Sequence, residues 1–163
     1  MIVRPAEESD LSAILEIYNH SIVHTTAVYS YQPLPYAYIE NWFRQKQEDG
    51  FPVLVAVNNA QVAGFASFGQ FRNWPAYKNT VEHTVHIHPE FRRQGIASQL
   101  ILRIIDEAKL RNMHTLIGGV DAENLGSIKF HEKLGFQEVA HFRQVGYKFD
   151  KWLDLKFFQL ILD

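Results

Sequence analysis

Residues Val81 to Ala108 read VEHTVHIHPEFRRQGIASQLILRIIDEA, and the rest of the chain is interpreted outward from them. The first eight residues are typical of a strand, which Pro89 ends. A basic turn follows at Arg92-Arg93-Gln94-Gly95-Ile96-Ala97, and then an amphipathic helix. Gly95 lets the backbone approach a ligand closely, and the helix presents free N–H groups and a positive dipole end. With two arginines beside it, this turn predicts an anion site suited to a pyrophosphate.

Composition and charge narrow the class of protein. The chain has 163 residues, of which 47% are apolar and 21% charged, as expected for a globular protein with one domain over residues 1–163. A net charge of -2 argues against nucleic acid as the main partner. The absence of cysteine excludes disulfides and thiolate metal sites, and fits a cytoplasmic location. No apolar run approaches the length of a membrane span or a signal core, so no membrane partner is expected.

The remaining periodicities predict a mixed α+β (mixed α/β) domain of order β-α-α-β-β-β-α-β-α-β-β. The predicted helices lie at about 11–22, 36–48, 97–108 and 127–134. Strands are predicted at 2–4, 53–57, 61–71, 81–88, 115–120, 137–145 and 152–162, with a hairpin turn at Asn58-Asn59. Gly64 and Gly69 are candidate bulges in the third strand. We expect the first helix to bury Leu11, Ile14, Leu15, Tyr18 and Ile22, and the second to bury Ile39, Trp42 and Phe43.

Two loops are rich in aromatic and polar side chains. The loop from His24 to Pro35 contains two threonines and two tyrosines, and it is either a pocket wall or a surface connection packed by its own aromatics. The loop from Phe71 to Asn79 contains Arg72, Asn73, Trp74 and Tyr77.

Two motifs in this order resemble the GNAT family of acetyl-CoA-dependent N-acetyltransferases. The first is the turn Arg92-Arg93-Gln94-Gly95-Ile96-Ala97, which is similar to the family's Gln/Arg-x-x-Gly-x-Gly/Ala. The second runs from Asn124 to Phe136 and resembles the family's Asn-x-x-Ala/Ser segment ending in Gly-Phe. Both motifs lie on the appropriate elements. The resemblance implies a mixed central sheet of six to seven strands flanked by about four helices.

The resemblance extends to one branch of the family. The segments 18–20, 25–27, 80–85 and 145–155 are similar to the phosphinothricin, methionine sulfone and methionine sulfoximine N-acetyltransferases. This similarity covers nearly the whole chain. It implies transfer of an acetyl group from acetyl-CoA to the α-amine of a small amino acid analogue.

The resemblance also implies where acetyl-CoA binds. The pyrophosphate is expected on the backbone N–H groups of Arg93, Gln94, Gly95, Ile96, Ala97 and Ser98. Pantetheine is expected to pair with the strand backbone at Val85, His86 and Ile87, whose N–H groups are also candidates for the thioester oxygen. Asn124 resembles the asparagine that contacts CoA. Gly118-Gly119 either leaves room where two strands separate or is a packing pair.

Glu82 and His131 are the candidate catalytic residues. Glu82 matches the glutamate that this branch is thought to use as a base, through water. An ordinary carboxyl is a poor base for an amine unless burial raises its pKa or ordered water takes part. Strand alternation places Glu82 on one face with Thr84, His86 and His88. His131 occupies a position where many relatives have tyrosine, and it is either the proton donor to the leaving thiolate or a hydrogen-bonded residue that lines the CoA channel.

The acceptor site requires a cation for the substrate carboxylate. Arg72 is the candidate because guanidinium binds carboxylate through two hydrogen bonds. Asn73, Trp74, Glu82, His83 and Thr84 complete the predicted substrate site, and Tyr29, Tyr31 and Tyr77 are weaker candidates.

Metal binding is not expected, because only His86 and His88 of the strand histidines share a face. The apolar final strand, Trp152 to Leu162, and the aromatic loops predict a homodimer interface. The alternative functions are an N-acetyltransferase of another amine, either a polyamine or a peptide N-terminus, and a non-catalytic acyl-CoA-binding module.

Overall fold

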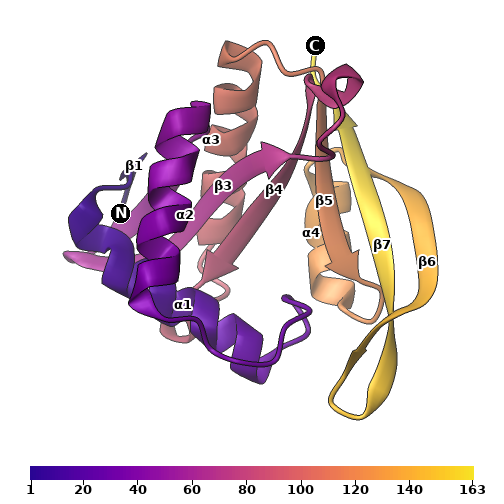
Figure 1. Cartoon of the computed structure of the whole chain (residues 1–163), viewed down its shortest axis with the longest axis horizontal. Coiled ribbons are helices and arrows are strands. Elements are labelled where there is room, and N and C mark those ends of the chain that lie inside the picture. Colours follow the sequence, from indigo (N-terminus) through magenta and orange to yellow (C-terminus); the bar gives the residue numbers. More distant parts are fainter.

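The computed structural model describes residues 1–163 as a seven-stranded sheet with four α-helices, as expected for a mixed α/β fold. The strands lie in the order β1-β2-β3-β4-β5-β7-β6 (Figure 1). Their bounds are β1 Ile2–Pro5, β2 Val53–Asn58, β3 Gln61–Gln70, β4 Thr80–Ile87, β5 Thr115–Asp121, β6 Gln137–Lys148 and β7 Lys151–Ile161. The helices are α1 Leu11–His24, α2 Tyr36–Asp49, α3 Ile96–Leu110 and α4 Leu125–Lys133, with short 3-10 turns η1 Glu8–Asp10, η2 Pro75–Tyr77 and η3 Pro89–Phe91.

One strand pair sets the geometry of the site. Strands β4 and β5 are the single parallel pair of the sheet, and they are joined only between Thr80–Glu82 and Thr115–Ile117. Beyond Glu82 the two strands diverge, which Figure 1 shows as a widening V. All other neighbouring strands are antiparallel. The divergence leaves one edge of β4 unpaired from His83 onward.

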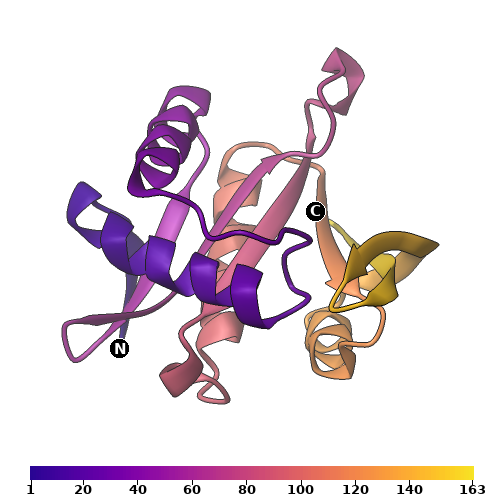
Figure 2. The ribbon, with the colours of Figure 1, turned by 60° about the horizontal axis from the view of Figure 1, so that its bottom comes forward.

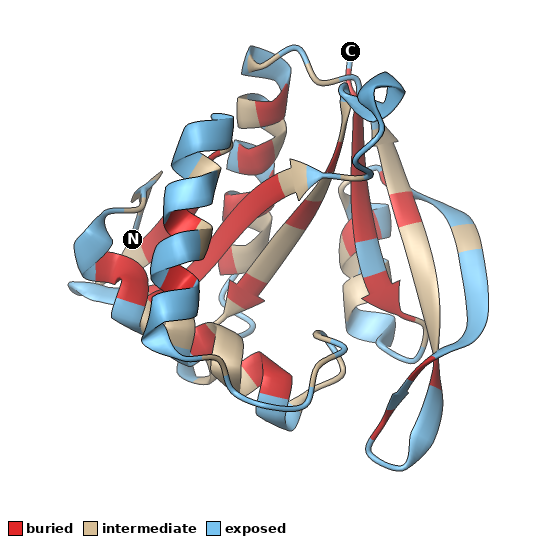
Figure 3. Cartoon of the chain, in the orientation of Figure 1, coloured by how far each residue is buried: buried red, intermediate tan, exposed pale blue.

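Helices cover both faces of the sheet (Figure 2). Helices α1 and α2 lie on one face, and α3 and α4 lie on the other. A cluster of eight buried residues joins α1 and α2 to β2 and β3, and a cluster of sixteen joins α3 to the centre of the sheet. Figure 3 shows this burial along the central strands and the inner faces of the helices. The burial of both faces of the sheet keeps β4 fixed between two packed layers.

Helix α3 forms because its apolar residues recur every three or four positions. Ile96, Leu100, Ile101, Ile104 and Ala108 are buried against the sheet, while Ala97 and Ile105 are only half-buried. The helix begins after Gly95, which adopts the left-handed conformation at φ +76°. That conformation is one that glycine adopts without strain.

Several local predictions were wrong in detail. The tight turn uses Asn59 and Ala60, both with positive φ, instead of Asn58-Asn59. A bulge does lie beside Gly64, since Ala63 has no partner between two paired residues, but Gly69 pairs regularly with Glu82.

The buried faces of the first two helices also differ from the prediction. In α1, Ile17 and Ser21 are buried where Leu15 and Tyr18 were expected, and in α2 Trp42 is half-buried.

Candidate active site

The diverging ends of β4 and β5 border a cavity of about 630 Å³. It runs from the α3 N-terminus, past the open edge of β4, to the beginning of α4. A smaller cavity of about 210 Å³ adjoins it and contains Glu82, His83 and His131. Val85, His86, Ser127 and Asn124 line both cavities, so the two form one continuous cleft.

The turn before α3 leaves backbone N–H groups free at the start of the helix. Arg93 and Gly95 both have positive φ, at 62° and 76°, and they bend the backbone so that the helix begins abruptly at Ile96. The first hydrogen bond of helix α3 is donated by the Gln99 N–H to the Gly95 carbonyl. The N–H groups of Ile96, Ala97 and Ser98 therefore have no acceptor within the helix and are available to a bound phosphate.

The free edge of β4 offers backbone groups to an extended ligand. The His88 N–H donates to the Ala63 carbonyl of β3 at 2.8 Å. Because backbone groups of successive strand residues turn to opposite sides, Val85 and Ile87 direct their N–H and carbonyl groups toward the open edge. These groups can pair with a pantetheine chain or polarise a thioester carbonyl.

The structure brings nine of the ten predicted cofactor residues to the larger cavity. The exception is Gln94, whose side chain donates to the Glu90 carbonyl at 3.4 Å. The sequence interpretation did not include Ser21, Gly126 or Phe130, which also line this cavity. Asn124 is the N-cap of α4, where its Oδ1 accepts from the Ser127 N–H at 3.1 Å.

Glu82 lies at the point where β4 and β5 separate. It is the last residue of the parallel pairing and it lines the smaller cavity. No protein group forms a hydrogen bond or an ion pair with its carboxylate, and burial raises the pKa of this carboxyl. A carboxylate with a raised pKa and no internal partner has the properties of a general base.

His83 and His131 form a stacked, buried pair, with ring centroids 5.1 Å apart. The His131 Nδ1 lies 2.7 Å from the Ser127 carbonyl, which can only accept, so Nδ1 carries the proton. Burial lowers the pKa of both rings, that of His83 to about 3, so both are neutral at pH 7. The His83 Nε2 must then donate to the His131 Nε2 across their 3.1 Å separation. This leaves the His83 Nδ1 as a buried acceptor with no partner.

Gly118 of β5 makes room for this pair. A Cβ atom at this position would lie 2.6 Å from the His83 Nε2 and 2.7 Å from the His131 Nε2. The adjacent Gly119 has ordinary space, because its Cβ would approach no atom closer than 3.4 Å.

The predicted carboxylate-binding loop stands apart from the cleft. Arg72, Asn73 and Trp74 are exposed, Trp74 to 70%, and none of them lines either cavity of the cleft. The Arg72 guanidinium lies 5.6 Å from the centre of the Tyr77 ring. Within one chain the structure therefore does not bring these three residues together with Glu82, His83 and Thr84.

The aromatic loop after α1 is held against strands β6 and β7 by side-chain hydrogen bonds. The buried Lys148 of β6, 3% exposed, donates to the carbonyls of Ile22, Thr25 and Val28. These three acceptors match the three N–H groups of an ammonium. The Tyr29 hydroxyl donates to the Asp154 carbonyl at 3.1 Å.

The loop that these hydrogen bonds hold in place also forms part of the cleft. Thr25, Thr26 and Ala27 line the larger cavity, so the loop is a pocket wall. Tyr31 donates to the Tyr147 carbonyl, and Gly146 leaves space for the Tyr29 ring. The roles of Lys148 and Gly146 depend on contacts more than 100 residues apart in the chain, for which the sequence carries no local signal.

Two further structural observations concern metals and membranes. No group of three or more histidine, aspartate or glutamate side chains is close enough to hold a metal ion. None of the helices is both long enough and apolar enough to cross a membrane.

The cleft thus lies at a diverging parallel strand pair, with a turn that leaves free N–H groups at the start of α3. The chain belongs to the acetyltransferase (GNAT) family, whose family model matches residues 12–136.

The chain is also similar to individual members of the family. It is 41% identical over 163 residues to the L-methionine sulfoximine/L-methionine sulfone acetyltransferase of Salmonella typhimurium, covering 100% of this chain and 95% of the relative. It superimposes with a TM-score of 0.98 and 48% identity on the crystal structure of an N-acetyltransferase from Staphylococcus aureus, covering 99% of this chain and 98% of that one. An acetyltransferase from Salmonella typhimurium, solved with its cofactor acetyl-CoA, superimposes with a TM-score of 0.97 at 41% identity, covering 99% and 94%.

Proposed function

We propose that this enzyme transfers the acetyl group of acetyl-CoA to the α-amine of a small amino acid, with methionine sulfone, methionine sulfoximine and phosphinothricin as the expected substrates. The observation that carries the proposal is the position of Glu82. Its unpartnered carboxylate lies at the end of the β4–β5 pairing, in the same cleft as the anion-binding turn. The similarity to a methionine sulfoximine/sulfone acetyltransferase along the full chain supports this substrate class.

In the proposed reaction Glu82 accepts a proton from the substrate ammonium through a water molecule. The amine lone pair then attacks the thioester carbonyl carbon. The N–H groups directed to the open edge at Val85 and Ile87 stabilise the oxyanion that forms. The carbon–sulfur bond breaks, the thiolate leaves, and it takes up the proton that the acylated nitrogen loses as the neutral amide forms. The pyrophosphate is held by N–H groups from Arg93 to Ser98 throughout.

His131 could act as the proton donor to the leaving thiolate or as a hydrogen-bonded residue that lines the CoA channel, and the geometry favours the channel-lining role. As an acid it would need a free N–H, but its Nδ1 proton is used by Ser127 and its Nε2 faces His83. Burial also lowers the pKa of His131, which disfavours the imidazolium. We therefore propose that His131 lines the channel and holds His83 in place.

We also propose that the protein forms a homodimer and that it has a separate site for the substrate carboxylate. Strand β6 lies at the edge of the sheet, and the β6–β7 hairpin exposes large apolar side chains at Phe142, Val145, Tyr147, Phe149 and Trp152. Arg72 is proposed to bind the substrate carboxylate, although its loop lies away from the cleft of its own chain. A cytoplasmic location is proposed with it. A monomer in multi-angle light scattering would contradict the dimer.

A thiol-release assay with acetyl-CoA tests the function. The acceptors are methionine sulfone, methionine sulfoximine, phosphinothricin, the standard amino acids and spermidine. We expect release with the oxidised methionine derivatives and little with spermidine, for which a more acidic site is needed. Release with spermidine alone would favour another amine substrate. No release with any acceptor, together with measurable binding of acetyl-CoA, would indicate a non-catalytic acyl-CoA-binding module.

A further inference from the structure

A small aromatic pocket lies on the α1–α2 face of the sheet, outside the acetyl-CoA cleft. Its volume is about 100 Å³, and it is lined by Tyr18 of α1, Tyr38, Ile39 and Trp42 of α2, Phe65 of β3 and Thr84 of β4. Phe65 and Ile39 are buried and form an apolar base. Edge-to-face contacts hold the aromatic pocket together, because the ring centres of Tyr18 and Trp42 lie 6.3 and 6.2 Å from the ring centre of Phe65.

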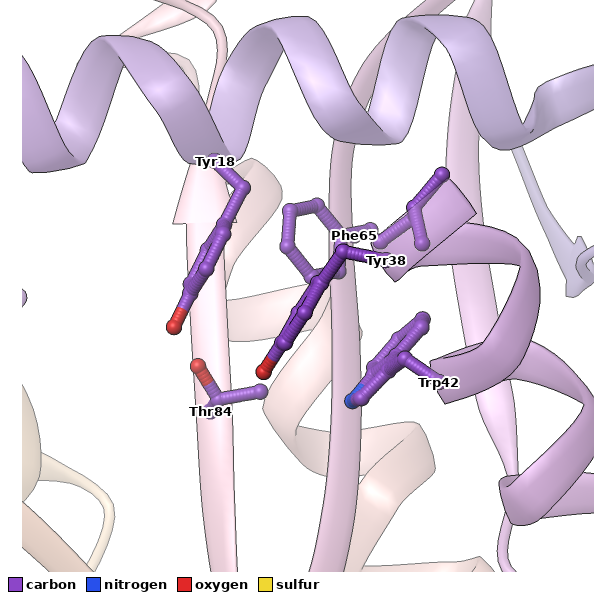
Figure 4. A pocket seen from close by; sticks show the side chains of 6 residues that line it. Tyr18, Tyr38, Trp42, Phe65 and Thr84 are labelled. Atoms are coloured by element: carbon purple, nitrogen blue, oxygen red, sulfur yellow. The ribbon is translucent and has the colours of Figure 1, made fainter. Parts of the chain in front are cut away.

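The polar atoms of this pocket converge and have no protein partners. Figure 4 shows the hydroxyl groups of Tyr18 and Tyr38 directed toward Thr84, whose own hydroxyl points back toward them, with the indole nitrogen of Trp42 at the same end of the pocket. None of these four groups forms a hydrogen bond within the protein. Three hydroxyls and one indole N–H can all donate, so the pocket is suited to a group with several acceptor oxygens.

The pocket borders the proposed reaction site. Thr84 lines both the aromatic pocket and the smaller cavity that contains Glu82. Glu82 and Thr84 are two residues apart on one strand face, which separates them by about 6.7 Å. In methionine sulfone the α-nitrogen and the sulfur are four bonds apart, about 5 Å when extended. A substrate whose amine is near Glu82 can therefore place its side-chain end in the aromatic pocket.

We infer that this pocket selects the oxidised sulfur of the substrate, so that Tyr18, Tyr38, Trp42 and Thr84 determine specificity. The inference rests on the proposed function. The pocket has no cationic side chain in its lining. The Lys46 ammonium lies 5.8 Å from the centre of the Trp42 ring, and it donates to the Phe68 carbonyl at 2.8 Å. Because burying an unpaired anion is costly, the neutral sulfone and sulfoximine are favoured over the anionic phosphinate of phosphinothricin.

The test compares methionine sulfone with methionine, which lacks the two oxygens. Tyr18→Phe and Tyr38→Phe each remove one hydroxyl and keep the ring. We expect kcat/KM for methionine sulfone to fall by about 2- to 12-fold per hydroxyl, with no change for methionine. The matched control is Tyr36→Phe, on the same helix but at a different cavity, and it should leave the ratio between the two substrates unchanged. Urea unfolding midpoints confirm that all the variants fold.

The outcomes separate this inference from the proposed function. Equal losses for sulfone and methionine, or no loss at all, overturn the specificity role while leaving amino acid acetylation intact. A higher kcat/KM of the wild-type enzyme for phosphinothricin than for methionine sulfone also overturns it. If the wild-type enzyme acetylates no amino acid, the proposed function and this inference both fail.

Discussion

The contact between His83 and His131 depends on a missing side chain at Gly118, so Gly118→Ala should be strongly destabilising. The new Cβ would lie 2.6 Å and 2.7 Å from the two Nε2 atoms, far inside normal contact distance. Both rings are buried, His83 to 8% and His131 to 2% exposed, and the new Cβ would displace both Nε2 atoms at once. Their 3.1 Å hydrogen bond must therefore break.

Two costs add in this variant. Overpacking a core costs about 1–3 kcal/mol. Leaving a buried polar group without its partner costs about 1–3 kcal/mol more. We expect the free energy of unfolding to fall by about 2–6 kcal/mol, measured from the urea midpoint and slope.

Gly119→Ala is the matched control for stability. Its Cβ would meet Phe157 and Leu155 at 3.4 to 3.7 Å, which is ordinary contact, so its effect should stay within about 1 kcal/mol. A Gly118→Ala protein as stable as Gly119→Ala would refute the description of the histidine pair.

Three further predictions follow from the same geometry. Glu82→Gln should lower kcat, measured by thiol release, by about 10²- to 10⁴-fold, and should leave the acetyl-CoA affinity, measured by calorimetry, unchanged. Weaker binding of acetyl-CoA by this variant would argue against a role of Glu82 as the base. Burial lowers the pKa of His83 to about 3 and of His86 to about 4, so their contribution to stability is present above pH 6.5 and lost as the pH falls towards 4. At pH 5 that loss is about 2 kcal/mol for each ring, and urea midpoints that do not change between pH 7 and pH 5 would contradict it. In Lys148→Met three backbone carbonyls lose their hydrogen-bond donor, so the variant should be less stable by about 3 kcal/mol. Its KM for acetyl-CoA should rise, and its amide hydrogen exchange should become faster first in residues 25–31.

The parts of the site predicted from sequence are those that depend on local pattern. Alternation along residues 81–88 placed Glu82 and Thr84 on one face, and in the structure Thr84 and His86 contact the α1–α2 side while His83 contacts α4. The Gly95 turn was predicted because glycine, placed just before an amphipathic helix, allows the tight backbone turn and the close approach of a ligand that other residues restrict.

The parts that were missed depend on contacts distant in sequence. In the sequence Lys148 is an ordinary strand lysine. Only the strand order β5-β7-β6 places its ammonium against the carbonyls at the end of α1. The His83–His131 hydrogen bond joins residues 48 positions apart. The aromatic pocket uses residues from α1, α2, β3 and β4, and the sequence interpretation assigned Trp42 and Tyr18 to the core because their spacing is that of a buried helix face.

The most direct test of the account is a single measurement of product with methionine sulfone and acetyl-CoA. We predict stoichiometric release of free thiol and one product, identified by mass spectrometry as methionine sulfone acetylated on its α-nitrogen, with the rate greatly reduced in Glu82→Gln. The absence of an N-acetylated product from the wild-type enzyme, or an unchanged rate in Glu82→Gln, would contradict the account.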